Sequence, residues 1–203
     1  MGAAVPGGAG AWQFARMPKS RPAGPAPDRA ALHEAALQHL ARFAATEAGL
    51  VRVLDRRIAR WARDAGVEPE AAACSRAAAR EVARALAGSG AVDDTAFAEA
   101  RARRLVRAGR SRRAVAAHLA AKGVDAGVLA QALPPEEDEL AAALAFARRR
   151  RLGPVRGGEA DADERRRELA ALGRAGFPRG VAERAVAMSI DEAEACVARL
   201  KQG

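Results

Sequence analysis

Apolar residues recur every three or four positions along most of the chain, which is the period of an amphipathic helix. The clearest example follows residue 93, where Ala98, Ala102 and Leu105 fall on one face. Asp93 can accept hydrogen bonds at the start of this helix, and Gly109 can supply its C-terminal turn. We therefore predict a helix between Asp93 and Gly109.

Two shorter helices are predicted directly after this one. Ser111 can cap the first, which ends at Gly123, where a left-handed backbone conformation suits glycine. Asp125 can cap the second, which the proline pair beginning at Pro134 stops. This block of about forty residues therefore predicts three short helices in a row.

Helical spacing also precedes this block. We predict a helix from Asp28 to about Ala45 with Phe43 on its apolar side, a second helix over about 50–64, and a third that begins at Pro69. A glycine-rich break follows the third helix. The first part of the chain therefore also predicts three helices.

The same pattern returns downstream, where a shift of 53 positions places Gly123 on Gly176 and Leu119 on Leu172. A period near fifty residues is typical of tandem helical units, each of which buries its apolar face against its neighbours. The predicted division is a disordered basic Gly/Pro/Ala-rich tail over 1–29, repeats over 30–90, 91–135 and 136–190, and a C-terminal tail or helix over 191–203.

Composition favours an all-α fold. Half of the residues are hydrophobic, but most of these are alanine, and aromatic residues make up only 3%. Sheets draw on β-branched and aromatic residues, whereas alanine, leucine, arginine and glutamate favour helices. We therefore predict an elongated all-α array of tandem three-helix repeats.

The chain is strongly basic. It holds 34 Lys and Arg against 25 Asp and Glu, with a formal net charge of +9, and only three of the basic residues are lysines. Guanidinium groups match the geometry of phosphates and carboxylates. A basic excess of this size indicates a polyanionic partner such as nucleic acid, or an acidic protein surface.

Candidate binding residues lie mainly in the block after residue 93. Arginines on its first helix lie opposite the apolar face, and others stand in the first turn of the next helix. There they oppose the helix dipole at a cost of about 0.3–1 kcal/mol, which hints at an external anion. The candidate set is Arg101, Arg103, Arg104, Arg107, Arg110, Arg112, Arg113, Lys122, Arg148 and Arg149.

The arginine run at 148–151 turns fully around its predicted helix, so some of its side chains are expected to face neighbouring protein. The acidic run at 136–139 supplies candidate partners for it. We therefore expect this run to divide between structural and binding roles.

No catalytic or metal-binding constellation stands out. His33, His39 and His118 lack neighbouring ligands or nucleophiles, and Cys74 and Cys196 lack metal-ligand spacing. We expect reduced thiols, no metal, no cofactor and no enzymatic activity. No apolar run approaches the roughly 20 residues of a membrane span, and no signal peptide stands out. We expect a cytoplasmic protein without membrane contact.

The block after residue 93 is similar to a known family in its acidic pair before a Phe-Ala helix, its arginine pair, its glycine turn and its Lys-Gly-Val helix end. The residues concerned are Asp93-Asp94-Thr95-Ala96-Phe97-Ala98-Glu99, Arg103-Arg104, Gly109 and Ala120-Ala121-Lys122-Gly123-Val124. A weaker similarity to the same family occurs at Arg174-Ala175-Gly176-Phe177. This pattern resembles the RecX family of RecA regulators.

The resemblance implies three tandem three-helix repeats in an elongated, curved protein. Members of this family bind the RecA filament on single-stranded DNA, limit its growth and depress strand exchange, ATP hydrolysis and co-protease activity. The resemblance therefore implies a regulator of homologous recombination, DNA repair and the SOS response. Its implied partners are RecA and single-stranded DNA, with duplex DNA as a further candidate, and we expect a monomer.

Three other functions stay open at this point. A helix-turn-helix regulator would use 125–133 as its recognition helix, but that segment holds no lysine or arginine, which base and phosphate readers usually present. A non-specific basic DNA- or RNA-binding protein needs nothing beyond the charge. A structural helical adaptor predicts that arginine substitutions have little effect.

Overall fold

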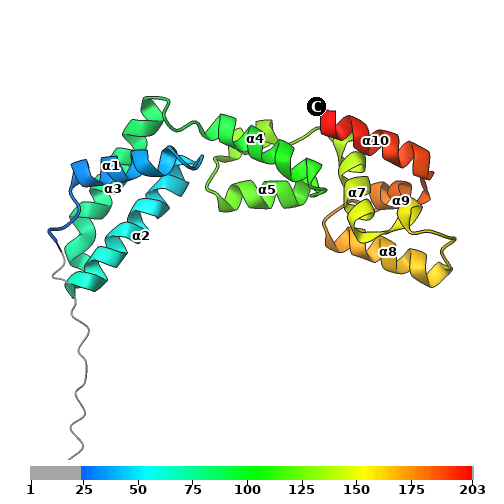
Figure 1. Ribbon diagram of the computed structural model, residues 1–203, viewed down its shortest axis with the longest axis horizontal. Coiled ribbons are helices and arrows are strands. Elements are labelled where there is room, and N and C mark those ends of the chain that lie inside the picture. The colour runs from blue at the N-terminus through cyan, green and yellow to red at the C-terminus, as the bar shows by residue number, and fades with distance from the viewer. Residues whose placement is uncertain (1–23, 203) are drawn as a thin grey trace, which may run out of the picture.

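The computed structural model describes residues 24–202 and shows a curved row of helices without a β-strand in that part of the chain (Figure 1). Residues 1–23 of the predicted tail lie outside the described residues. Just after them, the carbonyls of Gly24 and Pro27 accept hydrogen bonds from Trp61 and Ser75, so this segment lies against the first helices. The prediction of an elongated, curved all-α array is confirmed.

The helices fall into three consecutive groups, which we call the first, central and third units. The first unit comprises α1 (Arg29–Leu40), α2 (Glu47–Ala65), the 3₁₀ turn η1 (Pro69–Ala72) and α3 (Ala73–Gly88). The central unit comprises α4 (Asp94–Arg107), α5 (Arg112–Ala121) and α6 (Ala126–Ala132). The third unit comprises α7 (Glu137–Arg150), the 3₁₀ turn η2 (Gly153–Val155), α8 (Ala162–Arg174), α9 (Arg179–Ala187) and α10 (Ile190–Gln202). The repeat boundaries inferred from the sequence stay a prediction.

The helix ends of the central unit follow the capping residues that the sequence indicated. The side chains of Asp93, Ser111 and Asp125 accept hydrogen bonds from backbone N–H groups two or three residues further on, at 2.8–3.2 Å. Gly109 and Gly123 adopt φ values of +69° and +80°, which glycine reaches without a steric cost. The three helices predicted in this block are therefore confirmed.

The prediction for the first helix is wrong at its C-terminal end. α1 stops at Leu40, five residues before the predicted end, and Phe43 lies in the following link with 60% of its surface exposed. The reason is the next helix start: Thr46 accepts a hydrogen bond from the Gly49 N–H and begins α2 three residues earlier than predicted. A cap signal at Thr46 therefore overrides the apolar spacing that favoured a longer α1.

The hydrophobic core consists of two clusters. One belongs to the first unit and is built around Leu32, Leu50, Leu54, Ile58 and Val82. The other runs without interruption through the central and third units. α7 lies at its centre, and its residues from Glu139 to Ala145 are all buried, as in a helix surrounded by others. The central and third units therefore share one core, whereas the first unit has its own.

A set of hydrogen bonds joins the first unit to the central unit. The Thr46 hydroxyl donates to the carbonyl of Lys122 at 2.7 Å, and the backbone N–H of Glu47 donates to the Asp94 carboxylate at 2.8 Å. The Arg52 guanidinium donates to the same Lys122 carbonyl at 2.7 Å. This first junction thus combines polar bonds at the start of α2 with a close approach of Ala48 to Gly123, where a Cβ would lie 2.5 Å from the Ala48 Cβ.

The second junction repeats the arrangement between the central and third units. The Ser111 hydroxyl donates to the carbonyl of Ala175 at 2.7 Å, and the backbone N–H of Arg112 donates to both oxygens of Glu139 at 2.9 and 3.1 Å. The backbones also come close here, because a Cβ at Gly109 would lie 2.6 Å from the nitrogen of Phe146. The second junction therefore combines polar bonds with close helix packing.

Candidate functional site

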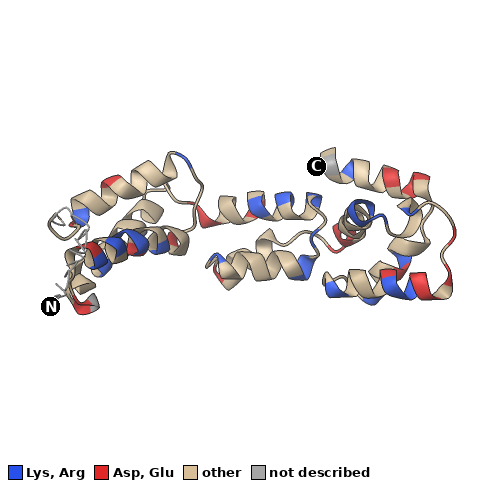
Figure 2. Ribbon diagram, turned by 60° about the horizontal axis from the view of Figure 1, so that its bottom comes forward, with Lys and Arg blue, Asp and Glu red and all other residues tan. Residues whose placement is uncertain are grey.

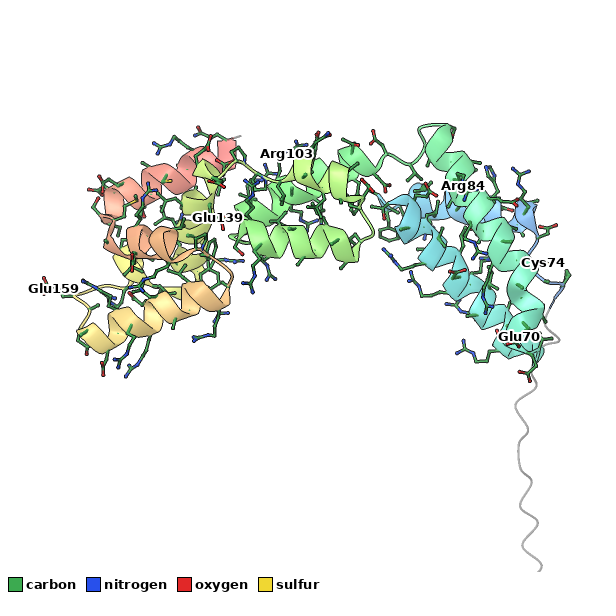
Figure 3. The ribbon with its side chains drawn as sticks, turned by 180° about the vertical axis from the view of Figure 1, so that it is seen from behind. Glu70, Cys74, Arg84, Arg103, Glu139 and Glu159 are labelled. Atoms are coloured by element: carbon green, nitrogen blue, oxygen red, sulfur yellow. The ribbon has the colours of Figure 1, made fainter. Side chains whose placement is uncertain are left out.

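The candidate arginines of α4 lie on the side of the helix away from the core. Ala98, Ala102 and Val106 are buried, whereas Arg103, Arg104 and Arg107 are exposed. Figure 3 shows Arg103 at the outer, convex edge of the array, and Figure 2 shows blue segments along α4. Arg103 forms an ion pair with Glu99, with 3.6 Å between Nη1 and Oε2. Arg104 and Arg107 make no ion pair within the described residues. These two side chains are therefore available for a partner.

Three other candidates surround His118 on α5. The Arg101 Nε–H donates to His118 Nε2 at 3.0 Å, so the neutral imidazole carries its own proton on Nδ1. Burial, followed by the positive charges of Arg101, Lys122 and Arg110, lowers the pKa of His118. A neutral His118 can hold the charged Arg101 in place, so Arg101 has a structural role as well as being a candidate.

Arg112 corrects the expectation of an external anion at the start of α5. Its backbone N–H is bound by the Glu139 carboxylate of α7, and its guanidinium donates to the Pro134 carbonyl at 2.8 Å. The anion at this helix start is therefore part of the protein. The neighbouring Arg113 is exposed and remains available.

The acidic partners expected for the arginine run at the end of α7 are not the ones the structure shows. All four residues from Arg148 to Arg151 are exposed, because the run lies at the free end of the helix rather than in its buried middle. Among the described residues, the acidic run 136–139 forms no ion pair with it, and Glu139 binds the α5 N-terminus instead. The Arg150 Cζ lies 5.6 Å from the centroid of the Phe146 ring, so this member of the run packs on protein. Arg148, Arg149 and Arg151 make no side-chain ion pair or hydrogen bond within the described residues.

The candidates do not form one continuous patch. Arg103 and Arg107 line a hollow of about 790 Å³ that also holds Glu99, Glu137 and Asp138, between α4, the α6–α7 link and α10. A second hollow of about 690 Å³, between α5 and the third unit, has Arg112 and Arg113 on its wall. The basic groups are thus divided between different faces of the array.

The sequence analysis missed a row of arginines on α2. These residues recur at spacings of three or four along one side of the helix, and all are exposed. Figure 1 shows α2, α5 and α8 following one another along the concave side, and Figure 2 shows blue segments gathered on α2. The residues are Arg52, Arg56, Arg60 and Arg63, with Arg57 beside them. Their spacing was a signal that could have been found without the structure.

The described residues contain no group of three or more histidine, cysteine or acidic side chains that could hold a metal ion. In the same part of the chain, no helix is long and apolar enough to cross a membrane. The short helix α6, which a helix-turn-helix protein would insert into DNA, carries no lysine or arginine.

The fold and surface define a basic, all-helical repeat protein. Residues 93–133 match the family model described as "RecX, second three-helix domain". The chain is 40% identical over 160 residues to Regulatory protein RecX of Myxococcus xanthus, an alignment that covers 76% of this chain and 83% of that protein. It is 41% identical over 107 residues to Regulatory protein RecX of Agrobacterium fabrum, covering 53% and 58% respectively. The chain belongs to the RecX family.

Proposed function

We propose that this protein binds the RecA filament on single-stranded DNA, limits the growth of the filament and lowers the activities of RecA. The similarity to a regulatory protein RecX over 83% of that protein's length carries this proposal. The protein acts as a monomer in the cytoplasm, and it regulates homologous recombination and DNA repair without catalysing a reaction itself.

The distribution of charge supports binding through several weak contacts. Arg104, Arg107, Arg110 and Arg113 are exposed on the central unit and make no hydrogen bond or ion pair through their side chains within the described residues. A single exposed ion pair contributes only about 0–1 kcal/mol. Affinity for an extended filament must therefore come from many such pairs along the array, and it should fall steeply with salt.

The test is RecA ATP hydrolysis on single-stranded DNA, titrated with this protein while DNA is in excess. We expect inhibition at much less than one molecule per RecA, and weaker inhibition by Arg104→Ala/Arg107→Ala. The control is Arg166→Ala/Arg179→Ala, which removes the same charge from side chains that pair within their own helices at 2.9 and 2.7 Å.

Two results would contradict the proposal in different ways. If the wild-type protein inhibits only when DNA is limiting, it sequesters DNA as a non-specific basic protein and does not regulate the filament. If both double variants inhibit as well as the wild type, the arginines of α4 are not part of the interface.

A further inference from the structure

A basic hollow lies between α1 and α2, outside the central unit. Its volume is about 530 Å³, and Arg42, Arg56, Arg57 and Arg60 line it without any acidic side chain. All four arginines are exposed, and within the described residues their side chains make no ion pair or hydrogen bond. Four guanidinium groups without a counter-charge favour a ligand that carries several negative charges close together.

Phe43 adds an aromatic surface to the same hollow. It is 60% exposed, whereas the other phenylalanines in the described part of the chain, Phe97, Phe146 and Phe177, are packed in the large core cluster. Its ring contacts His39 with 5.3 Å between the ring centroids. An exposed aromatic ring beside arginines is the combination on which proteins stack the bases of a single strand.

The link that carries Phe43 is held at both ends. The backbone N–H groups of Arg42 and Phe43 both donate to the His39 carbonyl, at 3.1 and 2.9 Å. Three residues later, the buried Thr46 caps α2 and bonds to the central unit. The backbone that carries the ring is therefore held in place before any ligand arrives, which lowers the entropic cost of binding.

We infer that this hollow binds a segment of single-stranded nucleic acid, with its arginines on the phosphates and Phe43 stacked on a base. A duplex fits less well, because its bases are already stacked on one another and cannot reach the ring. The inference deepens the proposed function and rests on it only in so far as that function includes contact with single-stranded DNA.

The first test measures the affinity of the full chain for a fluorescent oligothymidylate of about ten nucleotides, in the absence of RecA. Phe43→Ala should weaken binding about five- to 150-fold, which is the range for loss of one stacked base. The same substitution should have no effect on an abasic strand of equal length. The control is Leu37→Ala, which shortens an exposed apolar side chain on the neighbouring helix α1.

The second test concerns the phosphates. Arg56→Ala/Arg60→Ala should weaken binding and make its salt dependence shallower, by about 0.7 in the logarithmic slope for each phosphate that the protein no longer neutralises. The matched control is Arg80→Ala/Arg84→Ala on α3, where Figure 3 shows Arg84. Thermal melting of each variant verifies that it is folded.

The inference is overturned if Phe43→Ala binds the oligothymidylate as tightly as the wild type, or if both arginine pairs lose the same affinity. An equal effect of Phe43→Ala on normal and abasic strands also overturns it, because no base would then be stacked. The wild-type protein could bind the strand through this hollow and still leave ATP hydrolysis by RecA unchanged. That result would support the site and would refute only the proposed function.

Discussion

The junction between the first and central units and the junction between the central and third units repeat one hydrogen-bonding pattern. In each, a buried N-cap hydroxyl, of Thr46 or Ser111, donates to the carbonyl at the C-cap of the next unit's second helix. In each, the following backbone N–H donates to a carboxylate from the first turn of the next unit's first helix. The repeat is therefore visible in specific bonds as well as in helix order.

The two junctions differ in what lies beside these bonds. Two residues before Ser111 stands Gly109, whose missing side chain lets the α7 backbone approach. Two residues before Thr46 stands Ala44, which is exposed. The apolar core runs across the second junction, whereas the two core clusters are separate at the first.

One hydrogen-bonding pattern can therefore produce two kinds of connection between units. The central and third units form one body because shared apolar burial stabilises their contact. The first unit is attached mainly by polar bonds, each of which contributes about 1 kcal/mol net. We therefore expect it to open and reorient more readily than the rest of the array.

The largest effect is expected from Gly109→Ala. The new Cβ would lie 2.6 Å from the Phe146 nitrogen, and the residue would also have to hold φ at +69°. We expect the free energy of unfolding of the central and third units to fall by about 3 kcal/mol, measured by native-state hydrogen exchange of α7 amides.

Gly66→Ala is the control for this substitution. Gly66 has a similar φ of +64°, but nothing lies within 4 Å of the position of its Cβ. Gly66→Ala should therefore lower the free energy of unfolding only by the cost of holding alanine in a left-handed backbone conformation, about 1–2 kcal/mol. Equal losses at the two glycines would show that close packing at the second junction contributes nothing.

The next largest difference concerns the two carboxylates. Glu139 is buried and binds the Arg112 N–H with both oxygens, whereas Asp94 is half-buried and binds the Glu47 N–H with one. We expect Glu139→Ala to lower the free energy of unfolding by about 2 kcal/mol and Asp94→Ala by about 1 kcal/mol. Denaturant titration followed by circular dichroism measures both, and the reverse order would contradict the comparison.

Ser111→Ala and Thr46→Ala should each cost about 1 kcal/mol, because each removes a helix cap and a hydrogen bond to the next unit. The two variants should differ in which units of the array lose protection from hydrogen exchange. Hydrogen exchange should accelerate through both the central and third units in Ser111→Ala, and only in the first unit in Thr46→Ala. Acceleration across the whole array in Thr46→Ala would mean that the first unit is not separate.

The sequence predicted the helices of the central unit well because their ends are marked by local chemistry. Asp93, Ser111 and Asp125 act as caps through bonds to residues two or three positions away, which a linear pattern can reveal. The end of α1 was missed because helical apolar spacing continued to Phe43, while the competing cap at Thr46 was not recognised.

The binding residues were harder to predict, because charge alone does not say what a side chain faces. Arg112 and Arg101 were candidates, yet both have partners inside the protein. Arg112 bonds to Glu139 and Pro134, and Arg101 bonds to His118. These partners are 17 or more residues away, so only the folded chain brings them together. The arginine row on α2 is local and could have been recognised by its spacing.

The smallest effect is the pH dependence of the second junction. Burial raises the pKa of Glu139 above the usual 4.5, although the Arg112 N–H and charge oppose this. The folded state therefore binds a proton at Glu139 more tightly than the unfolded state does. The stabilisation is fully present below about pH 4.5 and is lost as the pH rises through the pKa of the folded state.

Glu139→Gln keeps an oxygen acceptor for the Arg112 N–H and removes this titration. We expect the free energy of unfolding of the wild type, measured relative to that of the variant, to increase as the pH falls from about 7 toward 4.5. Denaturant titrations of both proteins across this range measure the difference. If the difference decreases instead, the bond from Arg112 outweighs burial, and the second junction is stabilised by the ionised carboxylate.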